Sequence, residues 1–335
     1  MKHTVAVIGS GSYGTCLAIL FGRQGHAVRL WCRSEEMRRE LEERRENALY
    51  LPGHELPDSV KPTTGLDEAV SGARIVVGVT PSHAVRDVLG QAVPHLAGDV
   101  VMVNASKGLE ETSHARIDQI YEQILPAEIA ARATFLSGPT FAKEVALGLP
   151  SVIVMAGRDP ASTRLVQEAF STDRFRVYSS DDVVGVQLGG ALKNVIAICA
   201  GICDGLGLGN NARAALITRG LAEIARIGAR QGANPLTFAG LSGMGDLVLT
   251  CTGELSRNRR VGLELAAGKK IRDIIAEMRM VAEGVKTAKA AHDLAVLLGV
   301  RAPLSDTAYG ILYEDRPVAD AIGDLMTRSL RDERD

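Results

Sequence analysis

The chain lacks an excess of charge of either sign, and it has no hydrophobic run long enough to cross a membrane. Its 335 residues include 38 basic and 40 acidic side chains, which gives a formal net charge of −2. Nucleic-acid binding as the main activity is therefore disfavoured, because neutralising phosphates requires a basic excess or a basic face. The apolar stretch at residues 191–202 is shorter than the ~18 residues of a membrane span and contains Lys193 and Asn194.

Cysteine is scarce, and the N-terminal segment does not have the pattern of a signal peptide. The five cysteines are odd in number and mostly lie in apolar segments, as expected in a reducing cytoplasm. Cys199 and Cys203 stand four residues apart on an expected helix. Because no histidine or further cysteine lies near them in the sequence, we interpret them as core residues rather than as a metal pair. Glycines at residues 9–14 interrupt the segment where a signal peptide would have its hydrophobic core.

The chain divides into two halves of different pattern. In the first half, short apolar runs alternate with helical patterns, which predicts a doubly wound α/β sheet. The expected strands are residues 4–8, 27–32, 74–79, 100–104, 134–137 and 151–156. No convincing strand follows residues 177–178, and helical periodicity continues through residues 182–206, 211–231 and 287–298. We therefore predict an α/β domain over residues 1–189 and an all-helical domain over residues 190–335.

A glycine-rich motif follows the first expected strand and opens a helix. Gly9, Gly11 and Gly14 form the pattern G-x-G-x-x-G. Its glycines permit a tight turn, the approach of backbone to a pyrophosphate, and close packing of helix against strand. The pyrophosphate would lie against the helix N-terminus. A glycine-rich turn without a ligand is the alternative, but the strand–motif–helix context favours a dinucleotide-binding Rossmann domain.

The residue that follows the second expected strand bears on the choice of cofactor. Sites specific for NAD usually place Asp or Glu there to bind the ribose 2′-hydroxyl, whereas this chain has Arg33. A cation at this position suits the 2′-phosphate of NADP. Alternatively, Arg33 is a surface side chain of the charged helix expected over residues 34–47.

Polar residues follow two further strands at the carboxyl edge, where open α/β sheets bind ligands. Lys107 comes after the strand at residues 100–104, where it could meet an anion or a carbonyl group. Gly138 and Thr140 follow the strand at residues 134–137, in a turn that would expose backbone N–H groups and the threonine hydroxyl. Either segment could be a plain turn, but their position favours a ligand site.

Three segments of the helical half carry further polar groups. Lys193 lies among apolar residues, where burial would lower its pKa and suit it to proton transfer, unless its stem packs and its head reaches water. Asp246 places one acid in a loop of small residues. Ser256, Arg257 and Asn258 form a cationic polar turn that suits a phosphate monoester, although a solvated basic patch would have the same composition.

Taken together, these segments resemble the bacterial NAD(P)-dependent glycerol-3-phosphate dehydrogenases. The matching segments span almost the whole chain in the family's order: GSGSYGT (9–15), NASKGLE (104–110), SGPTFAKE (137–144), VQLGGALKNVIAI (186–198), NNARAALITRGLAE (210–223), GMGDLVLTC (243–251), SRNRR (256–260) and VAEG (281–284). One departure is Thr80, where the family usually has an apolar residue. This departure affects no expected catalytic group.

The resemblance implies a cytoplasmic, usually homodimeric enzyme that interconverts dihydroxyacetone phosphate and sn-glycerol 3-phosphate with NADH or NADPH, without a metal, and supplies phospholipid synthesis. It implies that Lys193 is the general acid/base. The implied substrate-binding residues are Lys107, Gly138, Thr140, Lys193, Asp246, Ser256, Arg257 and Asn258. With the motif glycines, the expected cofactor-binding residues are Gly9, Gly11, Ser12, Tyr13, Gly14, Arg33, Lys107, Ala142, Arg257, Val281 and Glu283.

Two other functions stay open on the sequence alone. One is a different two-domain dehydrogenase, such as a ketopantoate or 3-hydroxyacyl-CoA reductase, with the same Rossmann half and another pocket. The polar turn at residues 256–258 argues against it, because that turn suits a phosphate. The other is a non-catalytic module that senses NADP(H), which would need no proton donor such as Lys193.

Overall fold

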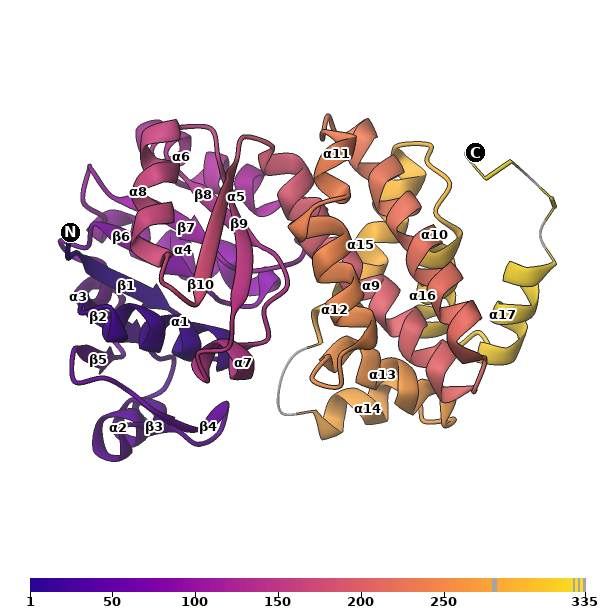
Figure 1. The fold of residues 1–335 in the computed structure, drawn as a ribbon, viewed down its shortest axis with the longest axis horizontal. Helices are drawn as coiled ribbons and strands as arrows, with labels where there is room; N and C mark the ends of the chain where they lie inside the picture. Colours follow the sequence, from indigo (N-terminus) through magenta and orange to yellow (C-terminus); the bar gives the residue numbers. More distant parts are fainter. Residues whose placement is uncertain (279–281, 328, 331, 334–335) are drawn as a thin grey trace.

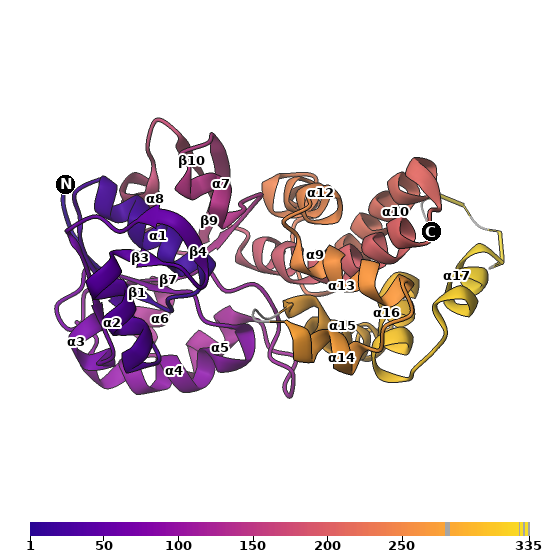
Figure 2. The same cartoon turned by 90° about the horizontal axis from the view of Figure 1, so that it is seen from below.

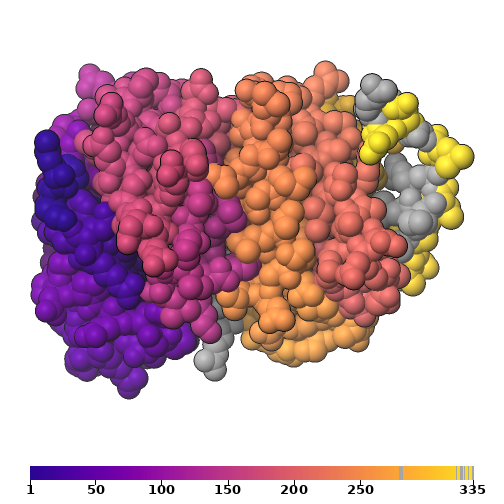
Figure 3. Space-filling model, in the orientation of Figure 1, coloured from indigo at the N-terminus to yellow at the C-terminus, as the bar shows by residue number. Residues whose placement is uncertain are grey.

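The computed structural model describes residues 1–278, 282–327, 329–330 and 332–333, and it divides into an α/β half and a helical half that lie side by side (Figure 1). The view from below shows the same division (Figure 2), and the two halves meet along most of their shared edge (Figure 3). The helix α9 (Val183–Gly205) leads from the sheet into the helical half. The predicted combination of a doubly wound sheet and a helical region is therefore confirmed.

An eight-stranded sheet forms the centre of the first half. In sheet order, its strands are β10 (Phe175–Ser180), β9 (Ser151–Gly157), β8 (Thr134–Ser137), β7 (Val101–Asn104), β6 (Ile75–Gly78), β1 (Thr4–Ile8), β2 (Ala27–Trp31) and β5 (Val60–Thr63). Every neighbouring pair is parallel except β8 and β9, so β9 and β10 run opposite to the other six strands. Six of these strands coincide with the expected apolar runs and β10 contains residues 177–178, whereas β5 was not predicted.

Helices cover both faces of the sheet. One face packs against α1 (Ser12–Arg23), α2 (Glu35–Arg44), α7 (Ala142–Ala146) and α8 (Pro160–Phe170). The other packs against α3 (Leu66–Val70), α4 (Val85–Ala92), α5 (Ile117–Ile124) and α6 (Ala127–Ala131), with the short turns η1 (Ser82–Ala84) and η2 (Val93–His95) flanking α4. In β1, Val5 and Val7 face the first core, and Ala6 and Ile8 face the second. A strand at the centre of a doubly covered sheet is buried on both sides, which explains its unbroken apolar run.

The charged helix that was expected over residues 34–47 ends earlier, and two short strands outside the main sheet follow it. α2 ends at Arg44, Arg45 adopts a left-handed conformation with φ 53°, and β3 (Glu46–Asn47) then pairs antiparallel with β4 (Leu51–Glu55). The edge strand β5 contains Pro62. Proline lacks the N–H that an inner strand would donate, so it is tolerated at an edge.

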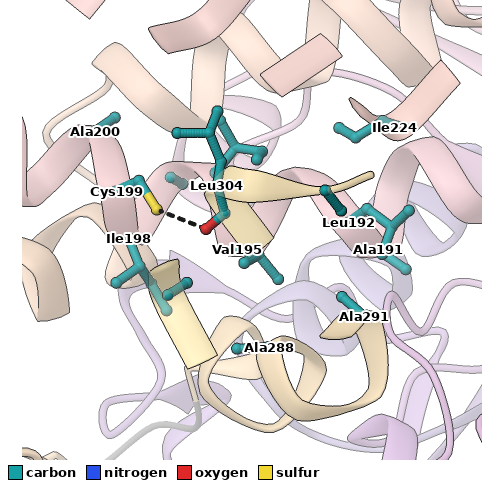
Figure 4. Close-up of a cluster of buried hydrophobic side chains, with 14 of the residues drawn as sticks. Ala191, Leu192, Val195, Ile198, Cys199, Ala200, Ile224, Ala288, Ala291 and Leu304 are labelled. Carbon is teal, nitrogen blue, oxygen red and sulfur yellow. Dashed lines mark hydrogen bonds between the residues drawn. The ribbon is translucent and has the colours of Figure 1, made fainter. Parts of the chain in front are cut away.

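The helical half packs around α9. The surrounding elements are α10 (Gly209–Arg230), α11 (Pro235–Phe238), η3 (Leu241–Gly245), α12 (Asp246–Thr252), α13 (Arg257–Ala266), α14 (Ile271–Glu277), α15 (Glu283–Leu297), α16 (Pro303–Tyr313) and α17 (Val318–Met326). By length and composition α9 could cross a membrane, yet 89% of its most apolar 18-residue window is buried inside the structure. Figure 4 shows part of this core, where α9 presents Val195 and Ile198 near Ala288 of α15 and Leu304 of α16.

Candidate active site

Three charged side chains from the two halves meet at the carboxyl edge of the sheet. Lys107 follows β7, Lys193 lies in the middle of α9, and Asp246 begins α12. Lys107 Nζ donates to Asp246 Oδ2 at 2.7 Å, and Lys193 Nζ donates to Asp246 Oδ1. The Asp246 side chain is only 1% exposed. One buried carboxylate therefore holds two ammonium groups that the sequence separates widely.

Lys193 is buried at its charged end as well as along its stem. The pKa of Lys193 is lowered to about 8: burial lowers it most, the Asp246 carboxylate partly opposes that effect, and the charge of Lys107 adds to it. Thr250 Oγ1 accepts a hydrogen bond from Lys193 Nζ at 2.8 Å and donates to the Asp246 carbonyl at 2.6 Å. The expectation of a buried lysine with a lowered pKa is confirmed. Thr250 was not predicted from the sequence as a site residue, although its spacing of four residues from Asp246 places both on one face of a helix.

A π-helical turn, η3, places Asp246 against α9. The sequence predicted a loop of small residues here, and that prediction is wrong, because the small residues instead permit close helix packing. A Cβ on Gly243 would lie 2.1 Å from the Phe238 carbonyl oxygen, and one on Gly189 of α9 would lie 2.5 Å from the Ser242 carbonyl oxygen. π-helical turns are rare and often occur at functional sites.

The turn after β8 presents a carbonyl group to the same cluster. The Gly138 carbonyl oxygen accepts from Lys107 Nζ at 3.0 Å and from Thr140 Oγ1 at 3.2 Å. Gly138 has φ +127°, and a Cβ there would lie 3.0 Å from the Ile153 Cα, so only glycine fits without strain. Ala142, also an expected site residue, begins α7 directly after this turn.

The three motif glycines of the first turn differ in what surrounds them. Gly9 has φ +123°, with a would-be Cβ 2.9 Å from the Val79 carbonyl oxygen, and a Cβ on Gly14 would lie 1.9 Å from the Gly9 carbonyl oxygen. A Cβ on Gly11, by contrast, would have no atom of the described residues within 4 Å. Packing therefore requires the outer two glycines, while Gly11 leaves open space at the N-terminus of α1. That open space fits a dinucleotide pyrophosphate, which has to approach the backbone closely.

The remaining residues expected at the cofactor site begin α1 and follow β2. Ser12 and Tyr13 are the first residues of α1, and burial raises the pKa of the Tyr13 phenol. Arg33 is exposed just beyond β2, which pairs with β1 and whose Trp31 carbonyl accepts from the Gly9 N–H at 3.3 Å. Arg33 therefore lies at the same edge of the sheet as the glycine-rich turn.

The segment expected to be a polar turn at residues 256–258 is instead the beginning of helix α13. Ser256 Oγ caps this helix by accepting from the Arg259 N–H at 3.2 Å, as serine commonly does at that position. Asn258 Nδ2 donates to Asn194 Oδ1 at 2.9 Å, and Asn258 Oδ1 accepts from the Gly284 N–H at 2.9 Å. Ser256 and Asn258 are both buried, Asn258 bonds to the residue that follows Lys193, and Arg257 is the exposed member of the three.

Glu283 begins α15 and reaches across to the α/β half. Its Oε2 accepts from Ser82 Oγ at 2.7 Å, and its Oε1 accepts from the Ser82 N–H at 3.3 Å. Ser82 was not predicted from the sequence as a site residue. Val281, expected near the cofactor, lies outside the described residues.

Comparison with known proteins places the chain in a family. Residues 4–163 match the family described as NAD-dependent glycerol-3-phosphate dehydrogenase N-terminus, and residues 182–323 match its C-terminus. The chain belongs to the NAD-dependent glycerol-3-phosphate dehydrogenase family. The resemblance seen in the sequence segments is therefore confirmed.

Individual glycerol-3-phosphate dehydrogenases resemble the chain over nearly its full length. A glycerol-3-phosphate dehydrogenase (NAD(P)+) from Geobacter sulfurreducens is 53% identical over 334 residues, which cover 100% of both chains. The crystal structure of glycerol-3-phosphate dehydrogenase from Coxiella burnetii is 36% identical, with a TM-score of 0.93 over 98% of this chain and 99% of that one. The enzyme of Saccharomyces cerevisiae is 28% identical, with a TM-score of 0.82 over 98% and 100% of the two chains.

At Thr80, where the sequence was expected to depart from the family's pattern, the contact runs through the backbone. The Thr80 carbonyl oxygen accepts from Ser106 Oγ at 2.5 Å, a bond that any residue at position 80 could accept.

The cysteines of this family member take no part in the charged cluster. All five are buried free thiols, and Cys199 Sγ lies 3.7 Å from the Leu304 carbonyl oxygen (Figure 4). Within the part of the chain that the structure describes, no group of three His, Cys, Asp or Glu side chains is placed to hold a metal ion.

Proposed function

We propose that this dehydrogenase reversibly reduces dihydroxyacetone phosphate to sn-glycerol 3-phosphate with NADPH or NADH. The observation that carries the proposal is the buried cluster of Lys107, Asp246 and Lys193 at the sheet edge that also holds the glycine-rich turn. The α/β half supplies the cofactor site and one lysine, and the helical half supplies the proton donor.

The proposed cofactor site combines the open turn with cationic side chains. The residues proposed to hold the cofactor are Gly9, Gly11, Ser12, Tyr13, Gly14, Arg33, Lys107, Ala142, Arg257, Val281 and Glu283. When bound, the reduced nicotinamide supplies the hydride for the keto carbon of the substrate. Arg33 suits the 2′-phosphate of NADPH, because a guanidinium pairs with phosphate oxygens and stacks on aromatic rings.

Lys193 is the proposed general acid. Negative charge develops on the keto oxygen as the carbon is reduced, and a buried ammonium group stabilises that charge before donating its proton. A pKa of about 8 keeps the donor protonated near neutral pH while making proton release easy. Asp246 and Thr250 fix the direction of the ammonium group.

The charge of the cluster suits a phosphorylated substrate. Two lysines share one carboxylate, so the cluster carries one net positive charge when all three groups are ionised. A positive site attracts a phosphate dianion and raises its local concentration. The residues proposed to hold the substrate are Lys107, Gly138, Thr140, Lys193, Asp246, Ser256, Arg257 and Asn258. Binding energy from the phosphate end orients the reacting carbon at the other end.

The decisive experiment follows the loss of NADPH absorbance after dihydroxyacetone phosphate is added to the purified protein, and repeats the assay with NADH. Unphosphorylated dihydroxyacetone and ketopantoate serve as comparison substrates. We expect turnover with dihydroxyacetone phosphate and far lower kcat/KM for the other two. Preferred turnover of ketopantoate would contradict the proposal, and so would NADPH binding without turnover of any substrate.

We further propose the cellular setting and the assembly that the family resemblance implies. The product would supply glycerophospholipid synthesis, in the cytoplasm, and the enzyme would act as a homodimer. The proposed limits of the two domains, 1–189 and 190–335, fall within α9 and place Lys193 in the substrate domain. Light scattering after size-exclusion chromatography tests the homodimer, because a mass near that of one chain would contradict it.

A further inference from the structure

A hydrogen-bonded junction joins the two halves beside the proposed active site. Ser82 is the first residue of η1, which follows β6, and Glu283 is the first residue of α15. Ser82 donates both its hydroxyl and its backbone N–H to the Glu283 carboxylate, at 2.7 Å and 3.3 Å. Each carboxylate oxygen has its own donor, so the pair of bonds fixes the rotation of the carboxylate as well as its position.

This junction lies directly against the turn that carries Lys107. A Cβ on Gly108 would lie 2.6 Å from Ser82 Oγ and 3.2 Å from Glu283 Oε2, so the pair packs on the backbone at this residue. The neighbouring Lys107 is held by Asp246, which also belongs to the helical half. The dipeptide 107–108 therefore meets two carboxylates of the helical half: Asp246 of α12 bonds Lys107, and Glu283 of α15, which Ser82 orients, packs against Gly108.

We propose that Ser82 is a positioning residue that sets cofactor affinity by holding the Glu283 carboxylate against the Lys107–Gly108 turn. The inference rests on the proposed function, in which Lys107 and Glu283 line the cofactor site. Ser82 is only 2% exposed and its hydroxyl donates to the Glu283 carboxylate, so the hydroxyl acts through Glu283. Without that hydroxyl, the carboxylate keeps the longer N–H bond to Ser82 but gains rotational freedom that cofactor binding then has to remove.

The test is Ser82→Ala, assayed by fluorescence titration of NADPH and by steady-state kinetics. A hydrogen bond to a charged group corresponds to about tenfold or more in an equilibrium constant, so we expect the Kd and KM for NADPH to rise about tenfold. At saturating NADPH and dihydroxyacetone phosphate, kcat should stay within about twofold of wild type, because Lys193 and Asp246 are untouched.

The chain provides a matched control. Ser162 on α8 is also buried and also donates its hydroxyl and its N–H to one carboxylate, that of Asp159, at 2.5 Å and 2.9 Å. Ser162→Ala therefore removes the same kind of bond far along the chain from the 107–108 turn, and it should lower thermal stability without changing the Kd for NADPH. A Ser82→Ala/Glu283→Ala double-mutant cycle then tests the route of the effect.

The energetic coupling between Ser82 and Glu283 in the double-mutant cycle decides whether the proposal holds. The proposal holds if Ser82→Ala weakens NADPH binding in the wild-type background and has no effect when Glu283 is already alanine. Equal Kd values for Ser82→Ala and Ser162→Ala would overturn it, and so would an undiminished Ser82→Ala effect in the Glu283→Ala background. These results are distinct from failure of the proposed function, in which the wild-type protein itself would neither bind nor oxidise NADPH.

Discussion

At the scale of single residues, Lys193 is subject to two opposing effects on its pKa. Burial lowers the pKa, and the Asp246 carboxylate raises it. Replacing it with methionine keeps the length and apolar bulk of the side chain, and Asp246 keeps Lys107 as its partner. We expect Lys193→Met to fold and to bind NADPH as wild type does. Its kcat should fall by on the order of 10²–10⁴, because the proton donor is lost. A near-normal kcat would remove Lys193 from the mechanism.

The lowered pKa of Lys193 predicts opposite pH profiles for the two directions of the reaction. Reduction requires the ammonium form, so kcat/KM for dihydroxyacetone phosphate should fall as pH rises through about 8. Oxidation of sn-glycerol 3-phosphate requires the neutral amine, so its kcat/KM should rise over the same interval. Profiles measured in both directions, with stability monitored at each pH, check the assignment. An inflection that persists in Lys193→Met would belong to another group.

Arg33 is the residue on which the choice between NADPH and NADH is predicted to depend. The wild-type enzyme should use NADPH at least as well as NADH, because Arg33 is exposed at the edge that holds the glycine-rich turn. Arg33→Asp removes a charge-assisted contact worth about 1.5–3 kcal/mol and adds repulsion of the 2′-phosphate. The ratio of kcat/KM for the two cofactors should therefore move toward NADH by more than tenfold, as measured with both cofactors in wild type and variant. A smaller change would place the control of cofactor preference at another residue.

At the scale of elements, the glycines in the turn between β1 and α1 have different roles. Gly14 is required for packing, whereas Gly11 leaves space for the cofactor. Gly14→Ala would place a Cβ 1.9 Å from the Gly9 carbonyl oxygen, and we expect it to cost about 1–3 kcal/mol of stability or more. Gly11→Ala meets no atom of the described chain within 4 Å and should leave the melting temperature almost unchanged. It should nevertheless raise the Kd for NADPH about tenfold or more, because the added methyl group occupies the ligand's space.

Thermal unfolding and NADPH titration of both variants test this separation. If Gly11→Ala bound NADPH as wild type does, the open space at this turn would not be the pyrophosphate site.

The strands of the sheet differ in how well the sequence predicts them. β1, β6 and β7 are apolar runs because they are buried on both faces, and that pattern is visible without a structure. The edge strand β5 has only four residues, including a proline, so neither its length nor its composition marks it. The antiparallel direction of β9 is also not visible in its own residues, because strand direction depends on how the connection through α7 returns to the sheet.

Some features of the candidate site can likewise be predicted from nearby residues in the sequence, whereas others depend on contacts between distant residues. Context in the sequence indicated Gly9, Lys107 and Lys193 one at a time, because each follows a strand or interrupts an apolar helix. The meeting of Lys107 and Lys193 on Asp246 could not be predicted from spacing, since Asp246 lies 139 and 53 residues away from them. The helical form of residues 256–258 was also missed, because capping serines and phosphate-binding turns share one composition.

At the scale of the whole molecule, a second cluster of charges ties the two halves together. The Asp118 side chain, on α5, is 1% exposed and accepts from Arg116 Nε and Arg158 Nη2, each at 3.0 Å. The Asp118 N–H donates to Gln187 Oε1 on α9 at 3.1 Å, and Arg116 Nη1 donates to Gln231 Oε1 beyond α10 at 2.7 Å. These bonds tie α5 to the beginning of α9 and tie Arg116 to the residue that follows α10.

We expect Asp118→Ala to destabilise the protein by about 3–5 kcal/mol, because it leaves the buried Arg116 guanidinium without its carboxylate. Glu122→Ala is the matched control, since Glu122 pairs with Arg158 at 2.6 Å but is 50% exposed. That variant should change stability by about 0–1 kcal/mol. Urea unfolding curves of the two variants measure both effects, and equal losses would contradict the role given to Asp118.

The position of α9 has a consequence for how the protein is made. The ribosome completes α9 at Gly205, but α15 and α16, which cover it, end about a hundred residues later, at Leu297 and Tyr313. At a translation rate of about 5–20 residues per second, α15 and α16 are completed about 5–20 seconds after the strongly apolar α9. During that interval its apolar surface is a target for chaperones and for other nascent chains. Slow translation of residues 206–313 should therefore lower the yield of folded enzyme more than equally slow translation before residue 183.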